Sequence, residues 1–322
     1  MITVAQDGTG DYTSIQEAVD RLPEHASRPR LLYIRNGLYR EKLYIDKPYV
    51  TLIGESAGGT VIEYSDYALK NYPDGTPYHT FNSYSVFLGG DDFTAENLTF
   101  ANTAGSGKEV GQAVAAYVDG DRAVSRRCRF TGRQDTLFTG PLPEQPMDRS
   151  RFGGPGDTLP RCHVRHLYEE CYIEGDVDFI FGSATALFLR CEIHSTGSGW
   201  ITAASTPEGV EFGYVFLDCR LTGSAPAPSV YLGRPWRNHA QTVFLRCWMG
   251  PHIRPEGWDN WNKPESEGTV RYAEAGCTGP GAKPESRVAW SRQLTEEEAQ
   301  AFTVQGILQG EDSWDPFSAE AQ

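Results

Sequence analysis

The octapeptide FLRCEIHS, residues 188–195, recurs in altered form five more times along this chain of 322 residues. Each copy has a small polar or thiol residue, then a variable residue, then an apolar one. The other copies are AENLTFAN (95–102), SRRCRFTG (125–132), YEECYIEG (168–175), FLDCRLTG (216–223) and FLRCWMGP (244–251). Self-similarity at this scale is typical of a solenoid, in which each repeat buries its core face against its neighbours.

The repeated small position predicts a row of stacked side chains. It is occupied by Asn97, Cys128, Cys171, Cys191, Cys219 and Cys247, at intervals of 31, 43, 20, 28 and 28 residues. Because the copies read as strands, we predict an all-β fold, a parallel β-helix with these side chains as one interior ladder. Free cysteine behaves as a small buried hydrophobe, and no pair has the C-x2-C spacing of a zinc site. We therefore predict packing cysteines without disulfides, and a ladder position instead of a glycan site at Asn97.

Only two segments have the pattern of helices. Apolar residues fall at helical spacing within residues 13–22, and Thr295 with Glu298 forms a possible capping box near the C-terminus. No linker or composition shift divides the chain, so we predict a single domain over residues 1–322. The longest interval between repeats contains TGPLPEQPMDRSRFGGPGDTLPRC (139–162), which predicts a long loop at about 140–165. Loops of this length in compact domains are often functional.

The composition excludes several classes of protein. With 29 basic and 43 acidic residues the net charge is −14, which argues against a nucleic-acid-binding protein. No apolar run approaches the ~18 residues of a membrane span. The opening MITVAQDGTGDYTSIQEAVD has no cationic region followed by an apolar one, so we expect a cytoplasmic protein, or an extracellular one if a leader has been trimmed.

A nucleophile-elbow motif is present but sits in the wrong context. Residues 54–58 read Gly-Glu-Ser-Ala-Gly, the G-x-S-x-G pattern of serine esterases. The elbow requires a following helix, whereas residues 60–64 are β-branched and extended. We predict that the motif is a glycine-rich turn between rungs and that Ser56 is not a nucleophile.

Four segments place polar residues where a plain solenoid would not. They are GQAVAAY (111–117), GRQDTLF (132–138), GDVDFIFG (175–182) and LGRPWR (232–237). In order and in relation to the ladder they resemble the signature segments of pectin methylesterases, and so do VAQDGTGDYTSIQEAV and NGLYREKLYI near the N-terminus. The resemblance covers nearly the whole chain and implies a right-handed parallel β-helix, the fold that pectin lyases share.

The resemblance implies a carboxylic ester hydrolase that releases methanol from galacturonate methyl esters. Asp178 matches the nucleophile that forms an acyl-enzyme, and Asp135 matches the general acid and base. Gln112 and Gln134 match the amide donors to the oxyanion, and Arg234 matches the partner of the nucleophile. These two roles require different pKa values, because one carboxyl group must be ionised while the other stays protonated near neutral pH.

Three aromatic residues, Phe138, Phe181 and Trp236, match the family's sugar-binding aromatics. The resemblance implies no cofactor and no metal. The polar residues of the four segments are Gln112, Gln134, Asp135, Asp178 and Arg234. Taken alone, any one of them is more simply interpreted as a turn residue that satisfies backbone groups. Because stacking can bring separate rungs onto one face, we expect the polar residues to converge.

Two positions depart from the family pattern. Asp176 stands where a threonine is common, and residues i and i+2 of a strand face the same side. We therefore expect Asp176 beside Asp178, where it could raise the pKa of that carboxyl or replace it as nucleophile. Arg133 stands where an aromatic is common and could contact a free carboxylate of a partly de-esterified substrate, although it should point away from Gln134.

Two other functions remain open at this stage. A pectin or pectate lyase on the same fold could bind Ca²⁺ through the clustered aspartates. A carbohydrate-binding solenoid without catalysis would account for the aromatics alone. For the esterase we expect methylated pectin or an oligogalacturonide as substrate, a monomer, and no nucleic-acid or membrane partner. The net charge predicts ready release of the polyanionic product, unless the groove is locally basic.

Overall fold

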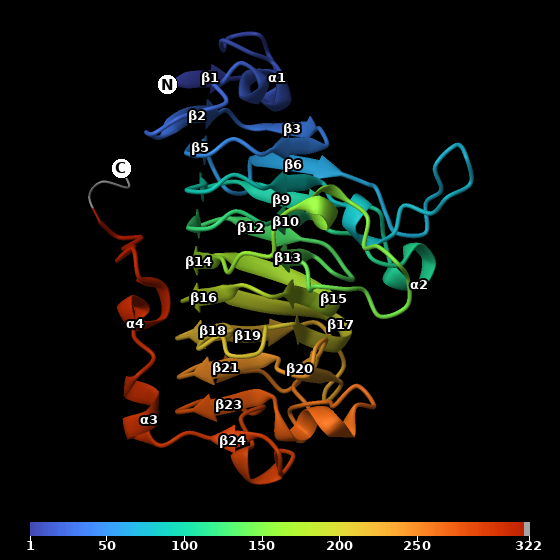
Figure 1. Ribbon diagram of the computed structural model, residues 1–322, viewed down its shortest axis with the longest axis vertical. Coiled ribbons are helices and arrows are strands. Elements are labelled where there is room, and N and C mark those ends of the chain that lie inside the picture. Colours follow the sequence, from blue (N-terminus) through green and yellow to red (C-terminus); the bar gives the residue numbers. More distant parts are fainter. Residues whose placement is uncertain (319–322) are drawn as a thin grey trace.

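A computed structural model, described here for residues 1–318, is a parallel β-helix whose rungs stack along one axis (Figure 1). Every pairing between named strands is parallel. The strands form three ladders that wrap the axis, and two long strands, β15 and β17, bend to serve two ladders. The predicted all-β parallel β-helix is confirmed in its strand arrangement.

The first ladder is an 11-stranded sheet. Its strands are β1 (Ile2–Val4), β2 (Arg30–Ile34), β5 (Val50–Gly54), β8 (Thr94–Glu96), β11 (Ala123–Arg126), β14 (Arg165–Glu169), β16 (Thr185–Leu189), β18 (Tyr214–Leu217), β21 (Gln241–Leu245), β23 (Arg271–Ala275) and β24 (Arg292–Gln293). The second ladder contains β3 (Gly37–Arg40), β6 (Thr60–Tyr64), β9 (Thr99–Asn102), β12 (Arg129–Thr131), β15 (Tyr172–Gly182), β17 (Glu192–Ala204), β19 (Arg220–Gly223) and β22 (Trp248–Met249).

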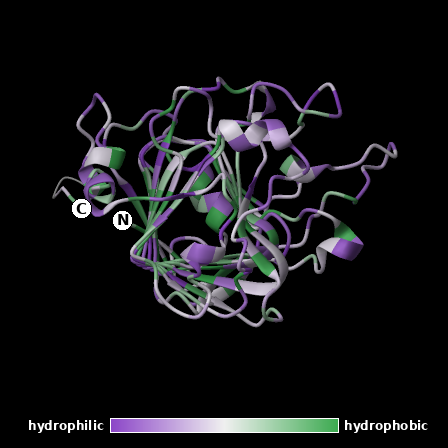
Figure 2. Cartoon of the chain, turned by 90° about the horizontal axis from the view of Figure 1, so that it is seen from below, coloured by the Kyte–Doolittle hydropathy of each residue, from purple (hydrophilic) through white to green (hydrophobic). Residues whose placement is uncertain are grey.

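The third ladder carries the candidate site. It contains β4 (Leu43–Ile45), β7 (Val86–Leu88), β10 (Ala116–Val118), β13 (Leu137–Thr139), the second halves of β15 and β17, and β20 (Val230–Pro235). The 3₁₀ turns are η1 (Thr80–Asn82), η2 (Pro155–Thr158), η3 (Pro264–Gly268) and η4 (Pro284–Ser286). Figure 2 looks along the stack and shows the C-terminal tail on one side and long loops on the other.

The structure confirms the interior row of cysteines, and one correction concerns the first position of that row. Cys171, Cys191, Cys219 and Cys247 are buried, and the Sγ of each donates to a backbone carbonyl of the preceding rung. Leu98, however, is the residue in register with Cys128, because Thr99 pairs with Arg129. Asn97 occupies the adjoining turn with a left-handed backbone (φ 54°), a conformation that asparagine tolerates better than most residues. Asn97 therefore shapes the turn and is not part of the interior ladder.

Both predicted helical segments contain helices. α1 (Ile15–Asp20) is capped by Ser14, and its buried Ile15, Ala18 and Val19 close the N-terminal end of the core. The Thr295–Glu298 capping box is present at the start of α3 (Glu296–Gln300). The second segment is two short helices, because Thr303 caps a separate α4 (Val304–Leu308). A further short helix, α2 (Gly107–Val110), lies beside the third ladder. Among the described residues, no helix is long and apolar enough to cross a membrane.

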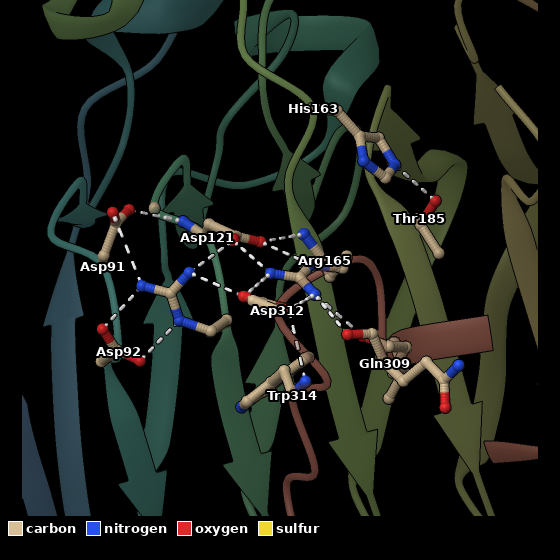
Figure 3. Close-up of polar contacts among 12 residues, drawn as sticks. Asp91, Asp92, Asp121, His163, Arg165, Thr185, Gln309, Asp312 and Trp314 are labelled. Atoms are coloured by element: carbon tan, nitrogen blue, oxygen red, sulfur yellow. Dashed lines mark hydrogen bonds and ion pairs between the residues drawn. The ribbon is translucent and has the colours of Figure 1, made fainter. Parts of the chain in front are cut away.

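The C-terminal tail runs back along the first ladder (Figure 1). Phe302, Ile307 and Leu308 pack on the outer side chains of that sheet. An ionic cluster fastens the end of the tail: Asp312 accepts two hydrogen bonds from Arg165, at 2.6 and 2.7 Å, while Asp121 accepts from the same guanidinium at 2.7 Å (Figure 3). The tail thus covers the face opposite the loops and leaves the third ladder accessible.

The G-x-S-x-G segment is a turn, as predicted. β5 ends at Gly54 and the next element is strand β6, not a helix. The Ser56 hydroxyl donates to Asn36 Oδ1 at 2.8 Å, with no histidine or carboxylate among its hydrogen-bond partners in residues 1–318. Ser56 therefore has the contacts of a turn residue.

Candidate active site

A cavity of about 450 Å³ lies on the outer side of the third ladder, at its middle rungs. Parallel pairing aligns Phe138 on β13, Phe181 on β15, Ala203 on β17 and Arg234 on β20 as one row across this face. The cavity is lined by Thr80, Phe81, Gln112, Gln134, Asp135, Pro146, Met147, Asp148, Arg149, Phe152, Asp178, Phe181, Ala203, Arg234, Trp236, Arg237, Trp261 and Lys263. The residues expected to converge from separate rungs, Gln112, Gln134, Asp135, Asp178 and Arg234, all lie in it.

Asp178 is held by a two-pronged contact with Arg234. The Nε of Arg234 donates to Oδ1 at 2.8 Å, and a terminal nitrogen donates to Oδ2 at 2.6 Å. Paired hydrogen bonds of this kind fix the plane of a carboxylate as well as its charge. Asp178 also has a left-handed backbone (φ 49°), where β15 departs from regular register with β17. The carboxylate is therefore displaced from the regular alternation of the strand and aimed into the cavity.

Two tryptophans that sequence reasoning missed hold Arg234 in place. Its guanidinium lies 3.7 Å from the ring centre of Trp200 and 3.7 Å from that of Trp261. Stacking on aromatic faces suits the planar guanidinium and restricts its rotation. Trp200 lies on β17, two residues before Thr202, whereas Trp261 comes from a distant loop. Only the folded structure therefore brings Arg234, Trp200 and Trp261 together. Trp261 follows the end of β22 by 12 residues, and nothing in the intervening sequence signals its contact with Arg234.

Asp135 is the second buried carboxyl, with 7% of its surface exposed compared with 6% for Asp178. Burial raises the pKa of Asp135 well above its usual range, and the charge of Asp178 raises it further. Burial also raises the pKa of Asp178, but the hydrogen bonds and charge of Arg234 oppose that rise. Asp178 therefore ionises first and Asp135 keeps its proton to higher pH, which is the split that acid–base chemistry by two carboxyl groups requires.

Gln112 and Gln134 offer free amide donors at the cavity. Within residues 1–318 neither side-chain amide has a hydrogen-bond partner. Gly111, at φ 74°, ends α2 and turns the chain to present Gln112. A Cβ at Gly107 would lie 2.4 Å from Gln134 Oε1, so glycine is what allows α2 to approach that side chain. Both amides are positioned without being consumed by internal contacts.

Two of the three predicted sugar-binding aromatics line the cavity. Trp236 and Phe181 do so, and their ring centres lie 5.9 Å apart. Phe138 does not: it is fully buried beneath the cavity, where its ring meets Tyr117 edge-on at 4.5 Å. Its side chain points outward from β13 as expected, but the overlying loops cover it. We therefore correct its placement from a sugar-contacting residue to a residue that supports the floor.

Asp176 lies outside the cavity lining, contrary to its expected place beside Asp178. The register shift after Gly175 ends the i, i+2 alternation on which that expectation depended. Asp176 Oδ1 instead accepts from the Val177 amide at 2.8 Å, and the charge of Asp176 adds to the rise in the pKa of Asp135. Arg133 is exposed and also outside the lining. Arg133 and Gln134 lie in the turn between β12 and β13, where the alternation of a strand does not apply, and of the two only Gln134 lines the cavity.

The long loop at 140–165 forms one wall of the cavity. Phe152 is buried between Phe81, at 5.4 Å, and Trp236, at 6.2 Å. Arg237 donates to Gln145 O at 2.7 Å, which ties the loop to the segment after β20. The loop also contributes Pro146, Met147, Asp148 and Arg149 to the lining. Composition indicated a functional loop here, but its side-chain contacts depend on how it folds over the third ladder.

The geometry defines a class of enzyme. A carboxylate oriented by an arginine, a second carboxyl that retains its proton, and two unengaged amides meet in one cleft of a parallel β-helix. That set can attack an acyl carbon, protonate a leaving group and stabilise an oxyanion, so the fold and site are those of a carboxylic ester hydrolase. Within the described residues, no group of three or more His, Cys, Asp or Glu side chains has the arrangement of a metal site.

Comparison with known proteins identifies the family. The Pectinesterase family model matches residues 1–142 and 145–311. Pectinesterase 31 of Arabidopsis thaliana is 38% identical over 320 residues, which covers 97% of this chain and 93% of that protein. The carrot pectin methylesterase structure superposes with a TM-score of 0.80 at 31% identity, covering 96% of this chain and 93% of that one. A pectin methylesterase solved in complex with a hexasaccharide gives a TM-score of 0.79 at 30% identity, covering 98% of both chains. The chain belongs to the pectinesterase family, and its β-helix is right-handed as in that family.

Proposed function

We propose that this chain hydrolyses galacturonate methyl esters of pectin or oligogalacturonides by way of an aspartyl acyl-enzyme. The observation that carries the proposal is the two-pronged contact of Arg234 with Asp178, next to a carboxyl of raised pKa. The similar pectin methylesterase solved in complex with a hexasaccharide supports an oligosaccharide as the ligand of this chain. Membership of the pectinesterase family favours this reaction over elimination by a lyase and over binding without catalysis.

The first half-reaction begins with ionised Asp178. An oxygen of this carboxylate attacks the ester carbonyl carbon, and the carbonyl oxygen becomes an oxyanion that accepts hydrogen bonds from Gln112 and Gln134. When the intermediate collapses, the bond to the methoxy oxygen breaks and Asp135 gives its proton to that oxygen. Methanol leaves, and an anhydride links Asp178 to the galacturonate.

The second half-reaction returns both carboxyl groups to their starting states. Water gives a proton to the Asp135 carboxylate and adds to the galacturonate carbon of the anhydride. Collapse of this second intermediate releases galacturonic acid, which loses its proton to solvent, and ionised Asp178, which Arg234 then holds again. We also propose that the monomer is the active form, because one chain supplies the nucleophile, the general acid and both oxyanion donors of this scheme.

A parallel assay on highly methylated oligogalacturonides with EDTA present tests the reaction. Methanol release without ultraviolet absorbance from unsaturated uronate ends is expected, whereas absorbance without methanol would indicate a lyase. Asp178→Asn should lower kcat by at least about 1,000-fold, because an amide cannot form the anhydride. Asp176→Asn, a matched charge change two residues away, should retain activity within about threefold. The reverse result for the two variants would overturn the assignment of the nucleophile.

A further inference from the structure

We infer that Lys263 is a positioning residue for the reaction: it holds the end of β20 so that Arg234 keeps Asp178 in place, and it adds positive charge beside that carboxylate. The inference rests on the proposed function. Lys263 lines the cavity, and its Nζ donates to the carbonyls of Pro235 at 2.9 Å and Trp236 at 3.2 Å. These two residues directly follow Arg234 in the chain. The ammonium group is therefore fixed to the stretch of backbone that carries the guanidinium.

Lys263 also contacts the aromatic stack on Arg234. Its Nζ lies 4.7 Å from the ring centre of Trp261, and that ring centre lies 3.7 Å from the Arg234 guanidinium. A cation near the face of an indole ring is attracted by the charge distribution of the ring. One loop therefore holds Arg234 in two ways, because Trp261 contacts its side chain and Lys263 contacts the backbone that follows it.

The backbone of this loop is bent in an unusual way just before Lys263. Trp261 and Asn262 both have left-handed backbones, with φ of 54° and 55°. This conformation is unfavourable for residues other than glycine, and it persists where the surrounding contacts enforce it. Those contacts are present: the Trp261 amide donates to Asp259 Oδ1 at 2.5 Å, and the Asn262 amide donates to Asn260 Oδ1 at 3.0 Å. The bend brings both Trp261 and Lys263 onto the end of β20.

Four charged groups act on the Lys263 ammonium. Its pKa is lowered to about 8 by burial and by the charges of Arg237 and Arg234, while the charges of Glu265, on η3, and Asp178, on β15, oppose that fall. Lys263 is therefore mainly an ammonium group below about pH 8. Its hydrogen bonds go to two carbonyls and not to a carboxylate, so its charge is not neutralised by an ion pair.

This charge acts on the nucleophile. Burial raises the pKa of Asp178, and Arg234 opposes that rise through its hydrogen bonds and its charge. The charge of Asp259 adds to the rise, whereas the charge of Lys263 opposes it. Because an opposite charge favours the ionised form of a carboxyl group, Lys263 supports Arg234 in keeping Asp178 ready to attack.

Lys263→Met tests the inference, because it keeps an unbranched apolar side chain and removes the charge and the N–H donors. On fully methylated hexagalacturonate, kcat at the pH optimum should fall about tenfold, the effect of one charge-assisted hydrogen bond, and KM should change less than about threefold. The acid limb of the kcat/KM profile should move to higher pH by about half a unit, because Asp178 then loses its proton less readily. The substrate is neutral, so a lost attraction between Lys263 and substrate charge cannot produce these effects.

Lys263→Arg restores the charge and the donors, and it should recover most of kcat and return the acid limb. Lys283→Met is the matched control, since Lys283 is exposed and lies outside the cavity. Its kcat and its acid limb should equal those of the unmodified enzyme.

An acid limb that stays in place in Lys263→Met would overturn the inference, as would losses that Lys263→Arg does not reduce. Denaturant unfolding of each variant identifies a purely structural role. A fall in kcat that matches a fall in the folded fraction would show that Lys263 only stabilises the loop, and this result would also overturn the inference. Absence of methanol release by the unmodified enzyme would instead refute the proposed function itself.

Discussion

Because of Asp119, the free energy of unfolding of the protein should fall as the pH rises from about 4 to about 7. This carboxyl lies beneath the loop at 140–165, where a Cβ on Gly140 would overlap its Oδ1. Its Oδ1 is buried without a hydrogen-bond partner in residues 1–318, and so is the hydroxyl of Tyr117 nearby. Burial raises the pKa of Asp119 from 3.8 to about 7, and the charge of Arg161 offsets only part of that rise.

The sign follows from proton binding. A carboxyl with a folded-state pKa above its unfolded value binds its proton more tightly when folded, so unfolding releases a proton between the two pKa values. The free energy of unfolding therefore falls as pH rises from about 4 to about 7, and the loss is complete above that range. With pKa values of 3.8 and about 7, the loss between pH 5 and pH 8 is about 2.5 kcal/mol.

Asp119→Asn removes this titration and keeps the shape of the side chain. Denaturant unfolding followed by tryptophan fluorescence at pH 5, 6, 7 and 8 should show the variant gaining about 2.5 kcal/mol relative to the unmodified protein across that range. Asp46→Asn, at an exposed position, is the control and should show no such relative gain. Parallel pH profiles for Asp119→Asn and the unmodified protein would refute the reasoning, as would a relative loss for the variant at pH 8.

Two further predictions concern the oxyanion donors and the C-terminal tail. Gln134→Leu should lower kcat about 100-fold and change KM less than about threefold, because the Gln134 amide acts on charge that develops after the substrate has bound. Steady-state methanol release would measure both constants, and a change confined to KM would contradict this role. Asp312→Asn should lower stability by about 1 kcal/mol and expose the tail to proteases, because Arg165 loses its two-pronged partner. The exposed Glu311→Gln is the control for the tail, and equal protease sensitivity of the two variants would count against the ionic cluster as its fastening.

The fold was largely predictable because it depends on local repetition. Each rung repeats a short apolar pattern and a turn, and such a pattern is legible wherever it recurs along the chain. The Asn97 position shows the limit of that method. The octapeptides aligned correctly, but the polar residue was assigned to the wrong column, and only the pairing of Thr99 with Arg129 places Leu98 in the cysteine row.

At the site, sequence by itself determined the chemical groups, and tertiary structure decided which of them meet. The motif segments identified Asp135, Asp178, Arg234 and the two glutamines, because the backbone geometry of each segment is local to one rung. The register shift that separates Asp176 from Asp178 and the burial of Phe138 under loops depend on neighbouring rungs. The pairing of distant indole rings on Arg234 and the position of Arg149 on the cavity wall depend on how long loops close over the third ladder. A loop conformation results from many weak, non-local contacts, and no short pattern in the sequence records them.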